Sequence, residues 1–399
     1  MKNSIYSEFV KGINVDNFIE KYYSSIDAMA EMSNTQQEPE WHGEGNVLNH
    51  TKAVVNCMSS FVNNDDSNKT KILIGSALFH DVGKVFCTIK AEDDNMVERI
   101  MSPKHANKGA SYLHHKLPIE DGRESIIDLV DRHHQPKTMI EGRINKYSIL
   151  NLTKYATGED FYKLCTSDTI GRISNGKELS FEKLDIFRMF CEEYNCFYQN
   201  NILDKTIFEE IESDKFDYTF LRTRYGLLNG EIENPIVGKS KYFNKGNFPI
   251  VIMMSGLSGS GKTTLASKIL KDYDFDMIIS PDKIRKDSKK CSRKEAFFSS
   301  LRLLKEALGQ NKRVIFDATL IMNSSIQKIN SLVDKYNGIS CLIQMNTLLS
   351  ECVSNDIKRS LNCVGEKTIQ KQARLYEKVR RERTMVNGME EIKKFINTL

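Results

Sequence analysis

The chain has 399 residues, of which 40% are hydrophobic and 28% are charged, and its formal net charge at pH 7 is +4. This length suits two domains, and the near-neutral charge excludes a strongly basic nucleic-acid footprint, although not a local basic groove. We find neither a signal peptide nor an apolar run of about 20 residues, so we expect no membrane association. The nine cysteines form no CxxC pair, which favours reduced thiols in a cytoplasmic protein.

The histidines divide the chain, because all eight precede residue 135. We expect a multi-domain protein: residues 1–200 form an all-α bundle, residues 201–247 connect, and residues 248–399 form an α/β domain. The connecting segment interleaves basic residues with Tyr and Phe. Such a pattern can bind nucleic acid, but we expect an ordinary solvated linker.

Imidazoles and carboxylates recur at the ends of predicted helices in the first half. Adjacent His80 and Asp81 can face one ion from a single helix end. A bundle can bring further ligands to that ion from neighbouring helices, and mixed His/Asp ligation suits Mn, Co, Ni, Fe or Zn better than Mg. We therefore expect one or two such ions. The candidate ligands are His50, His80, Asp81, His105, His133 and Asp168.

The ordered series of these ligands resembles the HD phosphohydrolase superfamily, whose signature is H…HD…D on helices. Gly83-Lys84 after the His-Asp pair and Gly171-Arg172 after the last aspartate strengthen the likeness. The resemblance implies an HD-type helical bundle that hydrolyses phosphoesters. Two metal ions could activate a water and clamp a phosphate, and Lys84 could stabilise charge on the phosphate oxygens.

The remaining histidines lead to different expectations. His42 and Glu44 are either contacts to a ligand or to the substrate, or ordinary loop residues. His134 is expected to be a neighbour of a ligand rather than a ligand. His114 and His115 are expected on a solvated helix face.

The second half opens on a glycine-rich loop. An apolar run over residues 249–254 leads into SGLSGSGKTT and then into a helix, which has the spacing and context of a P-loop. Its glycines let backbone N–H groups point at phosphate oxygens, while Lys262 reaches the β- and γ-phosphates and Thr263 holds Mg²⁺. The residues expected to bind ATP and Mg²⁺ are Gly256, Ser258, Gly259, Ser260, Gly261, Lys262, Thr263, Thr264 and Asp317.

Strands alternate with helices after this loop, which predicts a parallel sheet. Asp282, Arg285 and Asp317 follow or end predicted strands, at the edge where such sheets bind ligands. Asp282 could accept the proton of an attacking hydroxyl, and Arg285 could orient the acceptor. Asp317 could lie near Mg²⁺ or help to orient the acceptor.

This half resembles the polynucleotide 5′-kinase branch of the P-loop phosphotransferases, in which an aspartate base is followed three residues later by an arginine that contacts the acceptor. The family's lid reads E-C-[LV]-x-R-N-x-x-R. Here Asn355 replaces the first lid arginine, Asp356 replaces the asparagine, and Arg359 is kept. Contact with the transferring phosphate would therefore depend on Arg359. A charged helical tail is expected from residue 366, and its basic run over residues 378–383 is interpreted as a solvated face.

The order of the two halves resembles the HD-domain polynucleotide kinase/end-healing enzymes. The resemblance implies ATP-dependent phosphorylation of 5′-OH ends of RNA or DNA. It also implies hydrolysis of 2′,3′-cyclic, 2′- or 3′-phosphate ends, and an RNA or DNA ligase as functional partner. Three alternatives remain: a small-molecule kinase similar to adenylylsulfate kinases, a regulatory nucleotide-binding protein fused to an HD hydrolase, and a non-catalytic RNA-binding scaffold.

Overall fold

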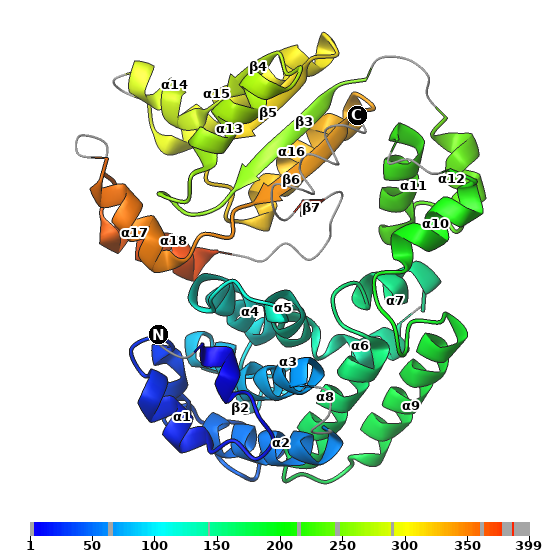
Figure 1. The fold of residues 1–399 in the computed structure, drawn as a ribbon, viewed down its shortest axis with the longest axis vertical. Coiled ribbons are helices and arrows are strands. Elements are labelled where there is room, and N and C mark those ends of the chain that lie inside the picture. Colours follow the sequence, from blue (N-terminus) through cyan, green and yellow to red (C-terminus); the bar gives the residue numbers. More distant parts are fainter. Residues whose placement is uncertain are drawn as a thin grey trace. The chain divides into compact units, whose positions relative to one another are not determined.

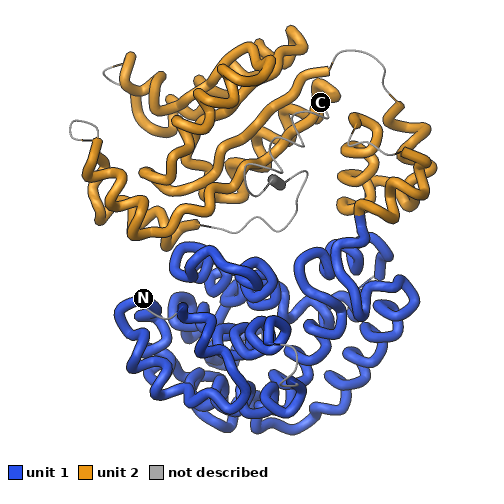
Figure 2. Tube along the Cα trace, viewed as in Figure 1, with its two compact units in different colours: residues 1–203 blue, residues 204–399 orange. Residues whose placement is uncertain are grey.

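The computed structural model describes residues 4–62, 67–142, 144–213, 217–243, 248–288, 291–359, 363–376 and 385–386. The chain divides into two compact units, Met1–Leu203 and Asp204–Leu399 (Figure 2). Among the described residues, no helix is both long and apolar enough to cross a bilayer.

The first unit is helical (Figure 1). Its α-helices are α1 (Val15–Tyr22), α2 (Val47–Phe61), α3 (Ser67–Phe79), α4 (His105–Lys116), α5 (Arg123–Arg132), α6 (Gln135–Glu141), α7 (Lys146–Leu152), α8 (Gly158–Gly171) and α9 (Glu178–Glu193). Short 3-10 segments occupy Ile5–Glu8, Asp27–Ser33 and Val82–Phe86. The expectation of a purely helical bundle is wrong in one detail, since β1 (Ile89–Glu92) and β2 (Glu98–Met101) form an antiparallel hairpin.

Helix α3 is the centre of this unit. Every residue from Leu73 to Phe79 is buried, as expected for a helix surrounded by other elements. It packs against α2, α5 and α8, so the residues that follow its last turn, His80 and Asp81, emerge in the interior. Pro136 lies in the first turn of α6, where a missing N–H costs nothing.

The second unit contains a parallel sheet of β3 (Ile250–Ser255), β4 (Met277–Ile279), β5 (Arg313–Asp317), β6 (Ile339–Gln344) and β7 (Met385–Val386). The strand order is β4-β5-β3-β6-β7. Its helices are α10 (Leu203–Ile211), α11 (Tyr218–Leu228), α12 (Pro235–Lys241), α13 (Lys262–Asp272), α14 (Pro281–Asp287), α15 (Arg293–Gly309), α16 (Asn323–Lys335), α17 (Leu349–Ile357) and α18 (Glu366–Leu375).

The helices cover both faces of this sheet. Residues of α15 and α16 share one apolar core with Val251 and Met253 of β3, so these two helices lie on the same face. Right-handed crossovers place α13, which leads from β3 past β5 to β4, on the opposite face. The sheet therefore has the three-layer architecture in which ligands bind at the carboxyl ends of the strands.

Residues 201–247, expected to be a solvated linker, include the three helices α10, α11 and α12. Arg222 of α11 forms an ion pair of 2.8 Å with Asp334 of α16. Its guanidinium also lies over the rings of Tyr225 and Tyr242, at 5.3 and 5.2 Å from their centroids. These basic and aromatic side chains thus contact one another. The predicted basic run over residues 378–383 lies outside the described residues.

Candidate functional site

Three histidine rings of the first unit are held in the same way. In each, Nδ1 lies 2.8–2.9 Å from the backbone carbonyl three residues earlier, and the pairs are His80–Ala77, His105–Ser102 and His133–Val130. A carbonyl only accepts hydrogen bonds, so Nδ1 must carry the proton and Nε2 must offer a lone pair. The buried Nε2 atoms of His80 and His133 have no hydrogen-bond partner among the described residues. Such oriented, unpaired nitrogens are what a metal ion requires of its ligands.

Asp81 lies between two pairs of imidazole rings. One pair is His50 and His80, and the other is His105 and His133. Asp81 Oδ2 is 3.3 Å from Nε2 of His80 and 3.7 Å from Nε2 of His50. Its other oxygen, Oδ1, is 3.2 Å from Nε2 of His105 and 4.0 Å from Nε2 of His133. Ligands held about 2.1 Å from one metal ion lie roughly 3–4 Å apart. One carboxylate thus offers an oxygen to each of two adjacent positions.

Asp168, on α8, completes the first group. Its Oδ1 lies 3.1 Å from Nε2 of His50, and ligand atoms of His50, His80 and Asp168 all lie within 4.8 Å of one another. A second such group contains His105, His133 and His134, with 2.9 Å between the Nε2 atoms of His105 and His134. The structure therefore brings together all six predicted ligands, and it adds His134 to the second group.

Cations surround the two carboxylates. Lys84 Nζ lies 2.8 Å from Asp81 Oδ2 and donates to Gln37 Oε1 at 2.6 Å. Arg172 donates to both oxygens of Asp168, at 2.9 and 2.6 Å, and Lys137 Nζ lies 3.2 Å from Oδ2. These cations offset the negative charge of the two buried carboxylates.

The electrostatics of the cluster match this arrangement except at His50, where burial lowers the pKa but Asp168 and Glu44 outweigh burial and raise it. Burial raises the pKa of Asp81, but the charges of Lys84 and His80 outweigh burial and hold that pKa well below its usual range. Burial likewise raises the pKa of Asp168, but the charges of Arg172 and Lys137 outweigh burial and hold that pKa well below its usual range. Burial, together with His105 and His80, keeps the pKa of His133 well below its ordinary value. Charged carboxylates and neutral imidazoles are the states that bind metal.

The sequence left the role of His42 and Glu44 open, and the structure places both beside this cluster. Glu44 Oε1 lies 2.8 Å from Nδ1 of both His42 and His50, and Glu44 Oε2 accepts from the N–H of Ile173. Lys137, four residues after His133, went unnoticed although helical spacing relates the two. The prediction for His114 and His115 is wrong, because both rings are buried.

The P-loop of the second unit has the backbone that its glycines predict. Gly256, Gly259 and Gly261 have φ angles of 151°, 84° and 89°, in the region that side chains disfavour. Lys262 begins α13, and its Nζ donates to the carbonyls of Gly256 and Leu257 at 2.9 and 2.7 Å. Burial lowers the pKa of Lys262 to about 8.

Thr263 and Asp317 meet beside this loop. Asp317, the last residue of β5, pairs in register with Met254 of β3, so the two strands end together. The Thr263 hydroxyl donates to Asp317 Oδ2 at 2.8 Å. Burial raises the pKa of the Asp317 carboxyl. A hydroxyl and a carboxylate at this distance are suitable ligands for Mg²⁺.

Asp282 and Arg285 lie on α14, directly after β4. Arg285 comes within 3.7 Å of Asp282 Oδ1, and the side chain of Asp282 is 68% exposed. The charges of Asp317, Arg359 and Asp282 all act on Lys262. The predicted base therefore lies in the same neighbourhood as the P-loop lysine and is accessible to an acceptor.

The two altered positions of the predicted lid have structural contacts. Asn355 donates from Nδ2 to the carbonyl of Gly259 at 3.1 Å. Asp356 Oδ2 accepts the N–H groups of Val364 and Gly365, both at 2.9 Å, and Arg359 lies 3.8 Å from its other oxygen. Helix α17 thus contacts the P-loop through an amide rather than through an arginine.

Helix α18 contains a P-loop contact that sequence reasoning missed. Gln372 accepts the Ser258 N–H at 2.9 Å and donates to the Ser258 hydroxyl at 3.0 Å. Of the other predicted loop residues, Ser260 is buried, and its backbone carbonyl accepts a hydrogen bond of 2.9 Å from the Thr347 hydroxyl. Thr264 is exposed on the first turn of α13.

Comparison with known proteins agrees with the second site. A family model described as an AAA domain (AAA_33) matches residues 251–379, so this part of the chain is a P-loop kinase-like domain. The match includes none of the first unit. No curated protein matches the chain.

Solved structures that match part of the chain include Kti12 from Chaetomium thermophilum in complex with ADP-AlF3, with 17% identity over 37% of this chain and 95% of that chain and a TM-score of 0.30. A gluconokinase from Sinorhizobium meliloti 1021 has 17% identity over 39% of this chain and 91% of that one, with a TM-score of 0.29. The protein APE1195 has 21% identity over 35% of this chain and 86% of that one, with a TM-score of 0.28.

Proposed function

We propose that the chain is a bifunctional enzyme that prepares RNA or DNA ends for a ligase. The second unit would transfer the γ-phosphate of ATP to a 5′-OH end. The first unit, as an HD-type phosphohydrolase, would hydrolyse a 2′,3′-cyclic phosphate or a 2′- or 3′-phosphate. The observation that carries the hydrolase half is the position of Asp81, with one oxygen toward each group of imidazoles.

The clustered histidines and aspartates of the first unit fit two transition-metal ions. His50, His80 and Asp168 would hold one, His105 and His133 would hold the other, and Asp81 would contact both. Bound metal ions would supply Lewis acidity and lower the pKa of a water molecule. The set of two carboxylates and several imidazoles suits Mn, Fe, Co, Ni or Zn.

The protein's own cations would position the phosphate. Lys84, Lys137 and Arg172 lie around Asp81 and Asp168, where each can donate to a phosphate oxygen. In cyclic phosphate opening, water forms a bond to phosphorus, one ribose oxygen leaves, and that oxygen takes up a proton. The cations stabilise the charge that develops on the phosphoryl oxygens.

The kinase reaction follows from the P-loop site. The 5′-hydroxyl would attack the γ-phosphorus while Asp282 accepts its proton, and the bond from γ-phosphorus to the bridging oxygen would break to release ADP. Lys262 would bind the β- and γ-phosphates, Thr263 and Asp317 would hold Mg²⁺, and Arg285 would orient the acceptor. Arg359, the lid arginine that is kept, would contact the transferring phosphate.

The kinase half is tested with labelled ATP and a 5′-OH oligonucleotide. Wild type should transfer the label, whereas Lys262→Ala and Asp282→Asn should lose roughly 100-fold or more in rate. Asp287→Asn is a matched control, since Asp287 is exposed on the same helix. A wild-type protein that labels no RNA or DNA end would contradict the proposal. Labelling of a small hydroxyl compound in its place would favour the small-molecule kinase.

The hydrolase half is tested with an RNA that ends in a 2′,3′-cyclic phosphate, in the presence of Mn²⁺, Co²⁺ or Ni²⁺. Asp81→Asn should abolish opening of the ring and leave the kinase rate unchanged. Lys262→Ala should do the reverse. If Asp81→Asn still opens the ring at the wild-type rate, the hydrolase site has been assigned to the wrong residues.

A further inference from the structure

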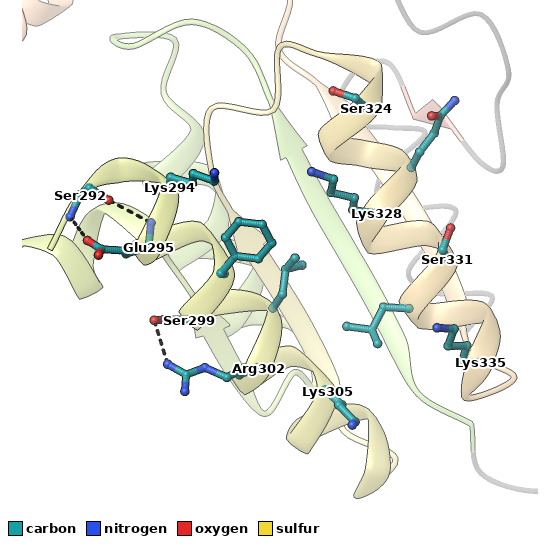
Figure 3. A pocket seen from close by; sticks show the side chains of 14 residues that line it. Ser292, Lys294, Glu295, Ser299, Arg302, Lys305, Ser324, Lys328, Ser331 and Lys335 are labelled. Atoms are coloured by element: carbon teal, nitrogen blue, oxygen red, sulfur yellow. Dashed lines mark hydrogen bonds between the residues drawn. The ribbon is translucent and has the colours of Figure 1, made fainter.

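A basic groove lies between α15 and α16, on the face of the sheet opposite α13. It encloses about 1170 Å³. Its floor includes the apolar side chains of Phe298, Leu301 and Leu332. The rims carry five cations, which are Lys294, Arg302, Lys305, Lys328 and Lys335. Figure 3 shows Lys294 and Lys328 extending toward the space between the two helices.

The charge of this groove is concentrated and unbalanced. Five cations and one carboxylate, that of Glu295, give a net charge of +4, which equals the formal charge of the whole chain. Glu295 is engaged in the cap of α15, where it accepts the Ser292 N–H at 2.7 Å. Among the described residues, none of the five cations has a carboxylate within ion-pair distance.

Two arginines of the same unit are paired. Arg222 contacts Asp334 at 2.8 Å, and Arg224 contacts Asp204 at 2.6 Å. Within the described part of the chain, the five cations of the groove lack such partners and gather around one cavity, and such a surface attracts a polyanion.

An aromatic ring within the groove favours nucleic acid over other polyanions. The side chain of Phe298 is 47% exposed, and Lys328 Nζ lies 5.7 Å from the centre of its ring. A ring beside a row of cations can stack a base while the cations neutralise phosphates, which is how proteins bind single strands.

The dimensions suit a short single strand. Lys294 and Lys305 are 11 residues apart on α15, which corresponds to about 16 Å along a helix. A stacked strand advances about 3.4 Å per nucleotide, so the groove could contact about five nucleotides. Its Lys294 end is next to α14, the helix that carries Asp282 and Arg285 and packs against α15.

We propose that the groove between α15 and α16 binds the phosphate backbone of a single-stranded RNA or DNA segment. It would hold several nucleotides of a polynucleotide whose 5′ end is presented to Asp282. The link to Asp282 rests on the proposed kinase function. Binding of a single strand does not rest on that function, because it depends only on the cations of the groove and the ring of Phe298.

The test measures binding of a fluorescent 20-nucleotide single strand, as RNA and as DNA, to the full-length chain. The oligonucleotide carries a 5′-phosphate and a 3′-OH, so that binding requires neither reaction. The groove variant is Lys328→Gln with Lys335→Gln. The matched control is Lys268→Gln with Lys271→Gln, since both of these lysines are exposed on α13, on the other face of the sheet.

The groove variant should bind the strand about tenfold more weakly at 0.1 M salt, and its slope of log K against log salt should fall by about 1.4, or about 0.7 for each lost phosphate contact. The control should match wild type. Phe298→Leu should weaken binding about fivefold with an unchanged slope, because it removes stacking and no charge. Binding of either RNA or DNA in this pattern supports the proposal.

Three results would overturn it: equal binding by the groove and control variants, binding of neither nucleic acid, or equally effective competition by polyglutamate, which has charge but no bases. The kinase assay distinguishes failure of the groove proposal from failure of the proposed kinase function. With a 20-nucleotide 5′-OH acceptor the groove variant should raise KM about tenfold, whereas its kcat/KM for a single 3′-nucleotide acceptor should not change. A chain without kinase activity that still shows the binding pattern would retain the groove and lose only the kinase assignment.

Discussion

Glu44 Oε1 lies 2.8 Å from Nδ1 of His50, and the other nitrogen of that ring faces Asp168 at 3.1 Å. The other oxygen of Glu44 accepts the N–H of Ile173 at 2.9 Å, just beyond the end of α8. One carboxylate thus contacts the imidazole of His50 and the chain just after α8, the helix that carries Asp168. The side chain of Glu44 is only 6% exposed, so this contact is shielded from water.

Replacing Glu44 by Gln should therefore weaken metal binding at the first position. Carboxylates that orient a metal-binding imidazole contribute about 10–100-fold to metal affinity. We expect such a loss for Glu44→Gln in a Mn²⁺ titration followed by calorimetry, with kinase activity unchanged. Glu20→Gln, at an exposed position of α1, should bind Mn²⁺ as wild type does. An unchanged affinity in Glu44→Gln would show that His50 needs no such support.

The position of Asp81 between two groups of imidazoles predicts a metal stoichiometry. Wild type loaded with Mn²⁺ or Co²⁺ should retain two ions per chain after desalting, measured by mass spectrometry of the elements. His133→Ala should retain about one, because only the second position loses a ligand, and Asp81→Ala should retain none. Two ions in His133→Ala would contradict the division into two positions.

Burial of Lys262 predicts that ATP binding takes up a proton. The pKa of this ammonium is about 8 in the free protein, and a bound triphosphate would raise it. Uptake should therefore increase as the pH rises through about 8, from a small fraction of a proton per ATP at pH 7 toward one proton at pH 9, and affinity should fall over the same range. Calorimetry in buffers of different ionisation enthalpy measures this uptake.

Lys262→Arg is the control for that experiment, since a guanidinium stays protonated over this range. Its binding should show no proton uptake between pH 7 and 9, whatever its affinity. Equal uptake by wild type and Lys262→Arg would assign the proton to another group, such as Asp317, whose charge acts on Lys262.

The local signals of the sequence were sufficient for the kinase half. The strand before the P-loop, the loop glycines and the helix after it are contiguous, and the strand pattern correctly predicted a parallel sheet with Asp317 at the end of β5. The contact of Gln372 with Ser258 spans 114 residues, and no local pattern announces it. Tertiary contacts of this kind decide what covers the loop.

In the helical half, too, local motifs were predicted from the sequence and long-range packing was not. Helix-end motifs identified six candidate ligands, and the structure brings them together because α3 is buried at the centre of the unit. The hairpin of β1 and β2 went unpredicted because each strand has only four residues and their side chains are mostly exposed. The burial of His114 and His115 depends on how α4 packs, which their polar character did not indicate.

Gly259 offers a test of how closely the lid packs on the P-loop. Its φ is +84°, and a Cβ atom added there would lie 2.1 Å from the carbonyl oxygen of Cys352 on α17. Because that oxygen belongs to the backbone of a helix, Gly259→Ala must displace either the loop or α17. We expect a loss of about 2–4 kcal/mol in the stability of the second unit and a drop of at least tenfold in ATP affinity.

Gly230→Ala is the matched control, since Gly230 has a φ of +70° in the same unit and a Cβ there would meet nothing within 4 Å. Backbone strain alone should cost about 1 kcal/mol at this position and leave ATP affinity unchanged. Urea unfolding with and without ATP measures both quantities. If the two variants are destabilised equally and bind ATP equally well, α17 does not restrain the P-loop, and the steric contact at Cys352 has no role in the nucleotide site.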